Sequence, residues 1–255
     1  MTVPFKAADS WTILSPIEQS IKSKIEAVGI PLKDWNIRIN YGIKTGCNEA
    51  FIIDGIKRAE LIRNDPKSAE IIRPILRGKD IKRYGYSFGN QYLIATHNGY
   101  CDSKGNEIPP ININDYPAIK AHLDGCWDVI SVRTDKGVTP YNLRNCAYWD
   151  DFSKQKVIWG EISDRPKFAF DNGEYMQEAT TFLMTGPKPK YLLAFLNSQL
   201  SMYFFSKIGT TTGIGTVRWK KFKLEEFSIP QPTPKRCDML VPLIDSLLIT
   251  CELKV

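Results

Sequence analysis

The sequence predicts an α+β fold in which a mixed, mostly antiparallel β body is flanked by helices. Short alternating or continuous apolar runs fill the middle of the chain, whereas apolar stripes of helical spacing occupy both ends. Hydrophobic residues make up 43% of the 255 residues, enough for a sizeable core. We divide the chain into a helical segment 1–34, a β-rich body 35–187 and a C-terminal region 188–255.

The first predicted helix follows Ser15, whose side chain can cap it. Pro16 fits the first helical turn, and Glu18 completes a capping box with Ser15. Apolar residues recur at helical spacing at positions 17, 21, 25 and 28, and Gly29 then ends the helix.

The β-rich body opens with an alternating strand over residues 35–41, a turn over 42–46 and a short buried strand over 50–53. Further strands are expected at 91–96, 156–162, 167–170 and 179–184. Helices are expected near 57–63, 66–72 and 115–124.

The C-terminal region begins with a wide apolar stripe that predicts one helix over residues 188–207. A Gly- and Thr-rich turn over 209–215 and a short basic strand follow. Residues 229–234 are Pro-rich and therefore stiff and extended, and a last helix is expected from about 235 to 253.

Basic residues are clustered along the chain. The net charge is +6, and residues 55–90 hold nine Lys or Arg against four acids. Residues 205–223 hold five Lys or Arg and no acid. Such clusters suit a polyanion, although a solvated basic face would give the same pattern.

Motifs for catalysis are missing. The sequence has no GxGxxG, no P-loop, no nucleophile signature and no Asn-Pro-Pro-aromatic motif of amino-group DNA methyltransferases. Asp150, Asp151 and Glu161 lie near Lys154 and Lys156, which leaves a metal-dependent nuclease as a minor alternative.

Neither a metal site nor a membrane segment is expected. The six cysteines form no CxxC pair and only two histidines are present, so we predict reduced thiols without zinc. No apolar run reaches the roughly 18–20 residues that span a bilayer, and no secretory signal is seen. We therefore expect a cytoplasmic protein.

Several segments in one order resemble a known family. They are residues 41–54, 72–84, 156–162 with 168–171, 191–198 and 229–232, and together they span about positions 35–232. The set resembles the TaqI-like C-terminal specificity domain. This is the target-recognition domain of type IIG restriction-modification enzymes and related adenine-N6 DNA methyltransferases.

The resemblance implies sequence-specific recognition of double-stranded DNA. It also implies a partner, the methyltransferase or nuclease domain of the parent chain, which would bind S-adenosylmethionine and modify a flipped adenine. We find no such domain in this sequence, so we assign it no cofactor and no catalytic residue, and we expect a recognition fragment without chemistry of its own.

The candidate DNA contacts are basic, polar and aromatic side chains on loops and in the basic clusters. They are Lys44, Thr45, Asn48, Arg77, Lys79, Lys82, Arg83, Tyr84, Lys136, Tyr141, Arg144, Thr211, Thr212, Arg218 and Trp219.

Structural roles stay open for some of these residues. Lys44 could be a solvated lysine in an ordinary turn. Arg77 could pair with Asp80 to fix a turn, and Trp219 could belong to the core.

Two alternatives of another class are also kept. One is a separate specificity subunit that docks on methyltransferase subunits through its flanking helices, and the other is a protein-interaction domain. Binding that ignores salt would favour the latter, because phosphate contacts weaken as salt rises.

Overall fold

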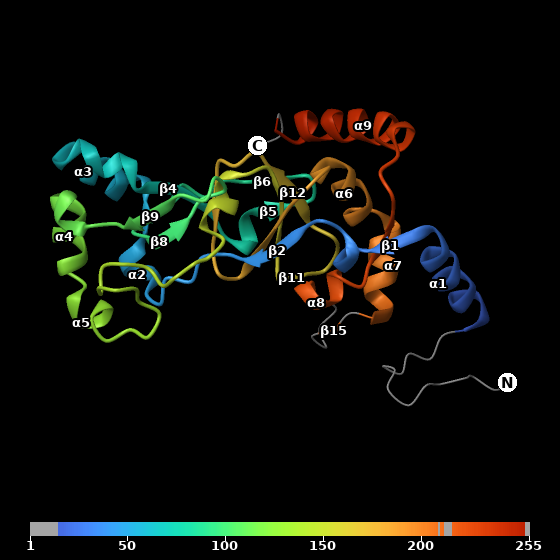
Figure 1. Ribbon diagram of the computed structural model, residues 1–255, viewed down its shortest axis with the longest axis horizontal. Helices are drawn as coiled ribbons and strands as arrows, with labels where there is room; N and C mark the ends of the chain where they lie inside the picture. The colour runs from blue at the N-terminus through green and yellow to red at the C-terminus, as the bar shows by residue number, and fades with distance from the viewer. Residues whose placement is uncertain (1–14, 209, 212–215, 253–255) are drawn as a thin grey trace.

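A computed structural model describes residues 15–208, 210–211 and 216–252. The molecule is elongated, with two lobes joined by a central sheet (Figure 1). The first helix, α1 (Pro16–Val28), extends beyond the second lobe at one end of the long axis.

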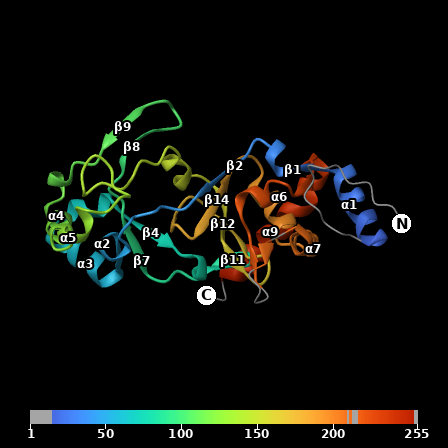
Figure 2. The same cartoon turned by 90° about the horizontal axis from the view of Figure 1, so that it is seen from below.

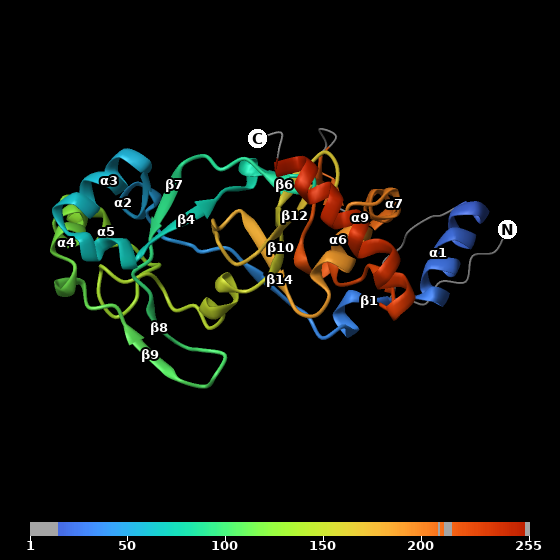
Figure 3. The same cartoon turned by 90° about the horizontal axis from the view of Figure 1, so that it is seen from above.

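The first lobe is built on a sheet of order β13-β4-β7-β3. Its strands are β13 (Met176–Gln177), β4 (Ile72–Leu76), β7 (Gln91–Ile94) and β3 (Ile52–Asp54), and only the β13–β4 pair is parallel. The helices of this lobe are α2 (Asn48–Phe51), α3 (Gly55–Asn64), α4 (Pro117–Asp124) and α5 (Trp127–Ile130). A hairpin of β8 (Asn98–Cys101) and β9 (Glu107–Pro110) projects from it (Figures 2 and 3).

The central sheet has the order β12-β10-β14-β2 and is fully antiparallel. Its strands are β12 (Phe168–Asp171), β10 (Lys156–Gly160), β14 (Thr181–Thr185) and β2 (Arg38–Tyr41).

Successive side chains of β10 enter different cores. Ile158 packs in the core of the first lobe, whereas Val157 and Trp159 pack in the core of the second. Successive side chains of a strand point to opposite faces, so the central sheet is buried on both sides. This explains why its strands are continuous apolar runs.

The second lobe covers the other face of the central sheet with helices and short strands. These elements are α6 (Pro189–Leu196), α7 (Gln199–Ile208), α8 (Lys221–Leu224) and α9 (Pro234–Glu252), with β1 (Gly29–Pro31) paired to β17 (Ser228–Pro230). A small sheet of β11 (Ile162–Ser163), β16 (Val217–Arg218) and β15 (Thr210–Thr211) closes one side of it. A short ribbon of β5 (Ile81–Lys82) and β6 (Gly85–Tyr86) lies beside β12.

The predicted α+β class with mostly antiparallel strands is confirmed. The capping box at α1 is also confirmed, because Ser15 accepts a hydrogen bond from the Glu18 N–H and the Glu18 carboxylate accepts one from Ser15. The helix expected near 57–63 is α3, the one near 115–124 is α4 and the last one is α9. The boundaries 1–34, 35–187 and 188–255 stay a prediction.

Three local predictions were wrong. Residues 48–51 form α2, so the strand expected at 50–53 begins only at Ile52. Residues 66–70 form a 3-10 turn, and β4 starts at Ile72, where a helix was expected. The single helix expected over 188–207 is two helices, because the Asn197 side chain bonds both the N–H and the carbonyl of Phe168 at the break.

Candidate nucleic-acid interface

A pocket of about 360 Å³ gathers cationic side chains from distant parts of the chain, and we call it the basic pocket. It is lined by Gly78, Lys79, Ile81, Lys82, Gly160, Glu161, Ile162, Ser163, Lys167, Thr180 and Arg218. Four of these residues are Lys or Arg and one is acidic, which makes the pocket attractive to an anion.

Two glycines allow the walls of the basic pocket to meet. A Cβ on Gly160 would lie 3.2 Å from the Cα of Gly78, so a side chain at position 160 would push β10 and the 78–80 turn apart by a few tenths of an ångström. Pairing of Ile162 with Arg218 then joins β11 to β16 and places the arginine on the same rim.

Arg77 and Asp80 shape the turn that presents Lys79. The buried Asp80 carboxylate accepts bonds from the Arg77 main-chain N–H at 2.9 Å and from its Nε at 3.0 Å. The internal pair that the sequence left open is therefore present, and we assign Arg77 to positioning. Lys79 is exposed, and its carbonyl accepts a bond from the Lys82 Nζ at 2.7 Å.

Among the described ion pairs, one joins two residues that line the basic pocket, Arg218 and Glu161. Their closest atoms, Nη1 and Oε1, are 2.9 Å apart, and both side chains are partly exposed at 40% and 30%. An exposed pair of this kind contributes little stability, so a ligand can replace it at low cost.

A second group of candidate residues surrounds the buried Arg133, and we call residues 42–48 with 131–144 the loop cluster. The guanidinium donates to the carbonyls of Thr45, Asp135, Pro140 and Asn142. It also stacks on the Phe51 ring at 4.3 Å. One side chain thus fixes two loops that are far apart in sequence.

Asp135 forms ion pairs with two cations of the loop cluster. Its carboxylate lies 2.8 Å from Lys44 Nζ and 3.1 Å from Arg144 Nη1. The hydrogen bond from Lys44 holds the pKa of Asp135 below its usual value. A pocket of about 440 Å³ lies beside these cations, and its Ala179 is the neighbour of Thr180 in the basic pocket, so the two sites flank one turn.

Other candidates in the loop cluster have internal partners. The Lys136 Nζ donates to the Ser131 carbonyl at 2.6 Å, and the Tyr141 hydroxyl donates to Asp124 at 2.5 Å. Asn48 is exposed, and its Oδ1 accepts a bond from the Thr45 hydroxyl at 2.6 Å.

Thr45 and Trp219 have buried side chains, each 1% exposed. Thr45 also accepts a bond from the Cys47 N–H, and the Trp219 ring lies 4.3 Å from that of Phe205. We correct the expectation that these side chains contact DNA and assign both to packing. The backbone of Thr211 belongs to β15, whereas Thr212 lies outside the described residues.

Arg83 and Tyr84 follow the basic pocket in sequence. Arg83 donates from Nη2 to the Asn197 carbonyl at 2.7 Å, and its guanidinium lies 5.1 Å from the Tyr84 ring centre. Tyr84 has a φ of 69°, which turns the chain sharply after β5.

The acidic residues considered for a nuclease all form ion pairs, Asp150 and Asp151 with Lys154 and Glu161 with Arg218. Asp151 is buried and binds Arg38, Asn40 and Lys154. Lys156 pairs with Asp171 in the interior, where burial lowers the pKa of the lysine. Within residues 15–208, 210–211 and 216–252, no three His, Cys, Asp or Glu side chains could together hold a metal ion.

Sequence reasoning missed Lys167, Gly160, Thr180 and Arg133. Lys167 lies in the short 164–167 loop with Arg165 and outside the two basic clusters, and Arg133 has no neighbour that distinguishes it from an exposed arginine. Of the helices in the described part of the chain, none is long and apolar enough to cross a bilayer.

Comparison with known proteins places the chain in a family. The TaqI-like C-terminal specificity domain matches residues 73–229, more than half of the sequence, so the chain belongs to that family. The predicted family, and with it the role in target recognition in restriction-modification systems, is confirmed at this level.

Individual relatives agree with the family. The chain is 22% identical to the type II methyltransferase M.PaeR7I of Pseudomonas aeruginosa over 256 residues, covering 96% of this chain and 42% of that protein. The chain thus spans less than half of this relative.

Two solved structures share the fold. One is the type IIL restriction-modification enzyme MmeI, solved in complex with DNA, which matches with a TM-score of 0.65 at 14% identity. The match covers 87% of this chain and 28% of the MmeI chain. The type IIG restriction endonuclease BpuSI has a TM-score of 0.56 at 14% identity, with coverages of 89% and 27%.

Proposed function

We propose that this chain binds double-stranded DNA through the basic pocket and the loop cluster and reads a specific target there. The observation that carries the proposal is the basic pocket, where Lys79, Lys82, Lys167 and Arg218 meet from three separate segments. Glu161 is the one acid that lines this pocket, and Asp164, outside the lining, pairs with Lys167. Cations concentrated in this way favour the phosphate backbone.

Within this interface, we assign different roles to lysine and arginine. The lysines act as point charges on phosphates, which fixes the position of the duplex but reads no sequence. Arg218 can exchange Glu161 for the O6 and N7 of a guanine, and Glu161 can accept from the amino group of a cytosine. Arg218 and Glu161 together therefore suit one G·C base pair of the target.

The chemistry of the whole system would belong to another domain. The relative M.PaeR7I is a methyltransferase, and the chain covers only 42% of it. We propose that a methyltransferase or nuclease domain of the parent supplies catalysis and binds S-adenosylmethionine, while the present chain has no catalytic role.

A test is to select bound sequences from a randomised duplex pool with the wild-type chain and with Arg218→Lys. We expect an enriched motif, and loss of a G·C preference at one position in the variant, worth about 1–3 kcal/mol. Affinity should fall as salt rises. Absence of any duplex binding at low salt would refute the proposal, whereas salt-dependent binding without a motif would limit it to backbone contact.

A second candidate, a separate specificity subunit, is favoured by α9. This helix packs on α6 with one face and leaves Met239, Leu243 and Ile249 exposed at 63%, 62% and 59% on the other. Size-exclusion chromatography of the chain with and without a separate methyltransferase subunit would distinguish the two organisations, because only a subunit would elute in a stable complex.

A further inference from the structure

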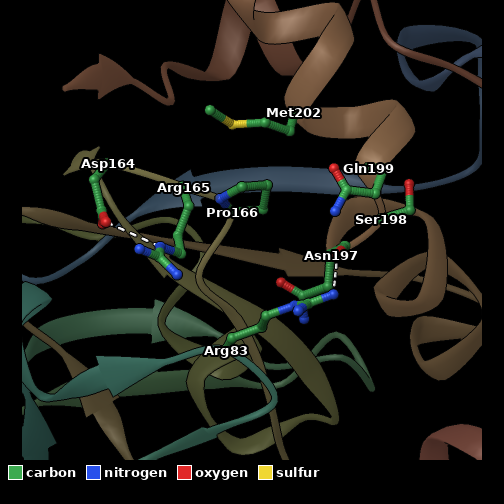
Figure 4. A pocket seen from close by; sticks show the side chains of 8 residues that line it. All are labelled: Arg83, Asp164, Arg165, Pro166, Asn197, Ser198, Gln199 and Met202. Atoms are coloured by element: carbon green, nitrogen blue, oxygen red, sulfur yellow. Dashed lines mark hydrogen bonds and ion pairs between the residues drawn. The ribbon is translucent and has the colours of Figure 1, made fainter. Parts of the chain in front are cut away.

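A second cationic pocket lies next to the basic pocket, and we call it the arginine pocket. It has a volume of about 300 Å³ and is lined by Arg83, Asp164, Arg165, Pro166, Asn197, Ser198, Gln199 and Met202. Figure 4 shows the two arginines on one side of the space and the start of α7 on the other.

Arg83 is fixed to the junction between α6 and α7. Its Nη2 donates to the carbonyl of Asn197 at 2.7 Å. Asn197 is itself buried and bonded to both main-chain groups of Phe168, so the arginine rests on a rigid support. A guanidinium has five N–H donors, and this contact uses one of them.

Arg165 belongs to the loop between β11 and β12. Its Nε lies 2.9 Å from Asp164, and the same carboxylate lies 2.7 Å from Lys167 Nζ. Among the residues that line the arginine pocket, Arg83 and Arg165 carry two positive charges against the one negative charge of Asp164, which Lys167 of the basic pocket also contacts. The lining therefore has a net charge of +1, which suits an anion.

The first turn of α7 adds to this environment. The Ser198 Oγ accepts a bond from the Ser201 N–H at 3.3 Å and donates to the Phe195 carbonyl at 2.6 Å, which caps the helix. The first N–H groups of a helix lack partners within it and point toward its N-terminal end. They add to the two guanidinium groups, which are the main attraction.

The arginine pocket and the basic pocket share a wall. Ser163 and Lys167 line the basic pocket, whereas Asp164, Arg165 and Pro166 between them line the arginine pocket. Lys82 and Arg83, which are consecutive, are divided between the two pockets in the same way. A polyanion held in one pocket is thus within reach of the other.

We propose that the arginine pocket binds one phosphodiester group of the DNA backbone outside the bases that are read. This inference rests on the proposed function and adds a site to it. Met202 and Pro166 supply an apolar edge for the sugar, and the arginines supply the donors for a phosphate. Free phosphate has the same chemistry and is the other possible source of the anion.

The test compares the salt dependence of duplex binding for wild type and for the double variant Arg83→Gln/Arg165→Gln. Loss of one phosphate contact should make the slope of log K against log salt shallower by about 0.9 and leave the selected motif unchanged. Lys24→Gln/Lys235→Gln, on α1 and α9, is the matched control with the same change of charge. Its slope should change less.

A second measurement does not depend on the variant being stable. Neutral methylphosphonates are placed one at a time along the duplex, and we expect one position outside the motif to weaken binding by wild type. Inorganic phosphate is tested separately. An unchanged slope with no sensitive position outside the motif would overturn the inference, as would binding of free phosphate without either effect. If wild type binds no duplex, the proposed function fails as well.

Discussion

The loop cluster and the basic pocket both contain several cations, but the two sites differ in how these cations are paired. In the loop cluster, Asp135 pairs with both Lys44 and Arg144, and Arg133 holds the main chain through four carbonyls. In the basic pocket, four cations surround one acid. The loop cluster has the same balance of four Lys or Arg to one acid, but its cations are bound to internal partners that fix its shape. In the basic pocket, Lys79 takes part in none of the described ion pairs. We infer that shape recognition and electrostatic attraction are separated along the surface.

Among the variants that test this comparison, Arg133→Ala is expected to have the largest effect. The change removes the guanidinium donor from four carbonyls, of which only that of Asn142 keeps another described donor, the Gly137 N–H, and each buried unpaired group costs about 1–3 kcal/mol. We expect a loss of about 3 kcal/mol or more in the free energy of unfolding, measured by urea denaturation. Arg144→Ala, at an exposed site, should cost no more than about 0.5 kcal/mol. Equal losses would show that Arg133 does not organise the loops.

The next largest effect tests whether the cations of the basic pocket attract DNA. Lys79→Gln/Lys82→Gln in the basic pocket should make the slope of log K against log salt shallower by about 1.8, about 0.9 for each phosphate contact. The matched pair Lys44→Gln/Arg144→Gln should change the slope less, because Asp135 pairs with both cations and offsets one of their two charges. Fluorescence anisotropy over a salt series measures both. A larger change of slope for the loop-cluster variant than for the basic-pocket variant would assign the attraction for DNA to the loop cluster.

A smaller effect is expected when the shared acid is removed. Asp135→Asn frees Lys44 and Arg144, so we expect binding to a duplex of unrelated sequence to strengthen by about 2- to 5-fold. Asp128→Asn on α5, an acid without a pair among the described ion pairs, is the control. Unchanged affinity for Asp135→Asn would mean that the two cations do not face DNA.

The smallest effect concerns pH. The pKa of Asp135 is lowered in the folded protein, chiefly by Lys44, so this carboxylate stabilises the fold above its unfolded pKa. That contribution is lost as pH falls from about 4 through the lowered folded value. We expect wild type to exceed Asp135→Asn in stability by less than about 1 kcal/mol at pH 6 and to lose this margin as the carboxylate becomes protonated below about pH 4. A difference that stays constant over this range would exclude titration of Asp135 as its cause.

Local elements could be predicted from the sequence, whereas the site needed the tertiary structure. The cap of α1 depends on residues three apart, and the apolar runs of β10 and β14 are visible in any window. The basic pocket depends on contact between Gly78 and Gly160 and on the pairing of Ile162 with Arg218, which no local pattern encodes.

Burial explains the remaining errors at the site. Trp219 lies in a basic segment, yet its ring is enclosed by the core of the second lobe. Asn197 interrupts the expected long helix because its side chain bonds a strand that lies 29 residues away in sequence. Both effects depend on partners that are distant along the chain.

The packing of β10 limits which segments can be exchanged between related proteins. Because its alternate side chains complete the packing on both of its faces, neither lobe is a self-contained module, and a chimera joined within residues 156–185 would combine two mismatched interiors. The 164–167 loop carries Arg165 and Lys167 between β11 and β12, outside the central sheet, whereas the loop 135–144 is anchored to the first lobe through Arg133 and Leu143. Variation in target preference is therefore expected to accumulate in the loops, while the sheet stays constant.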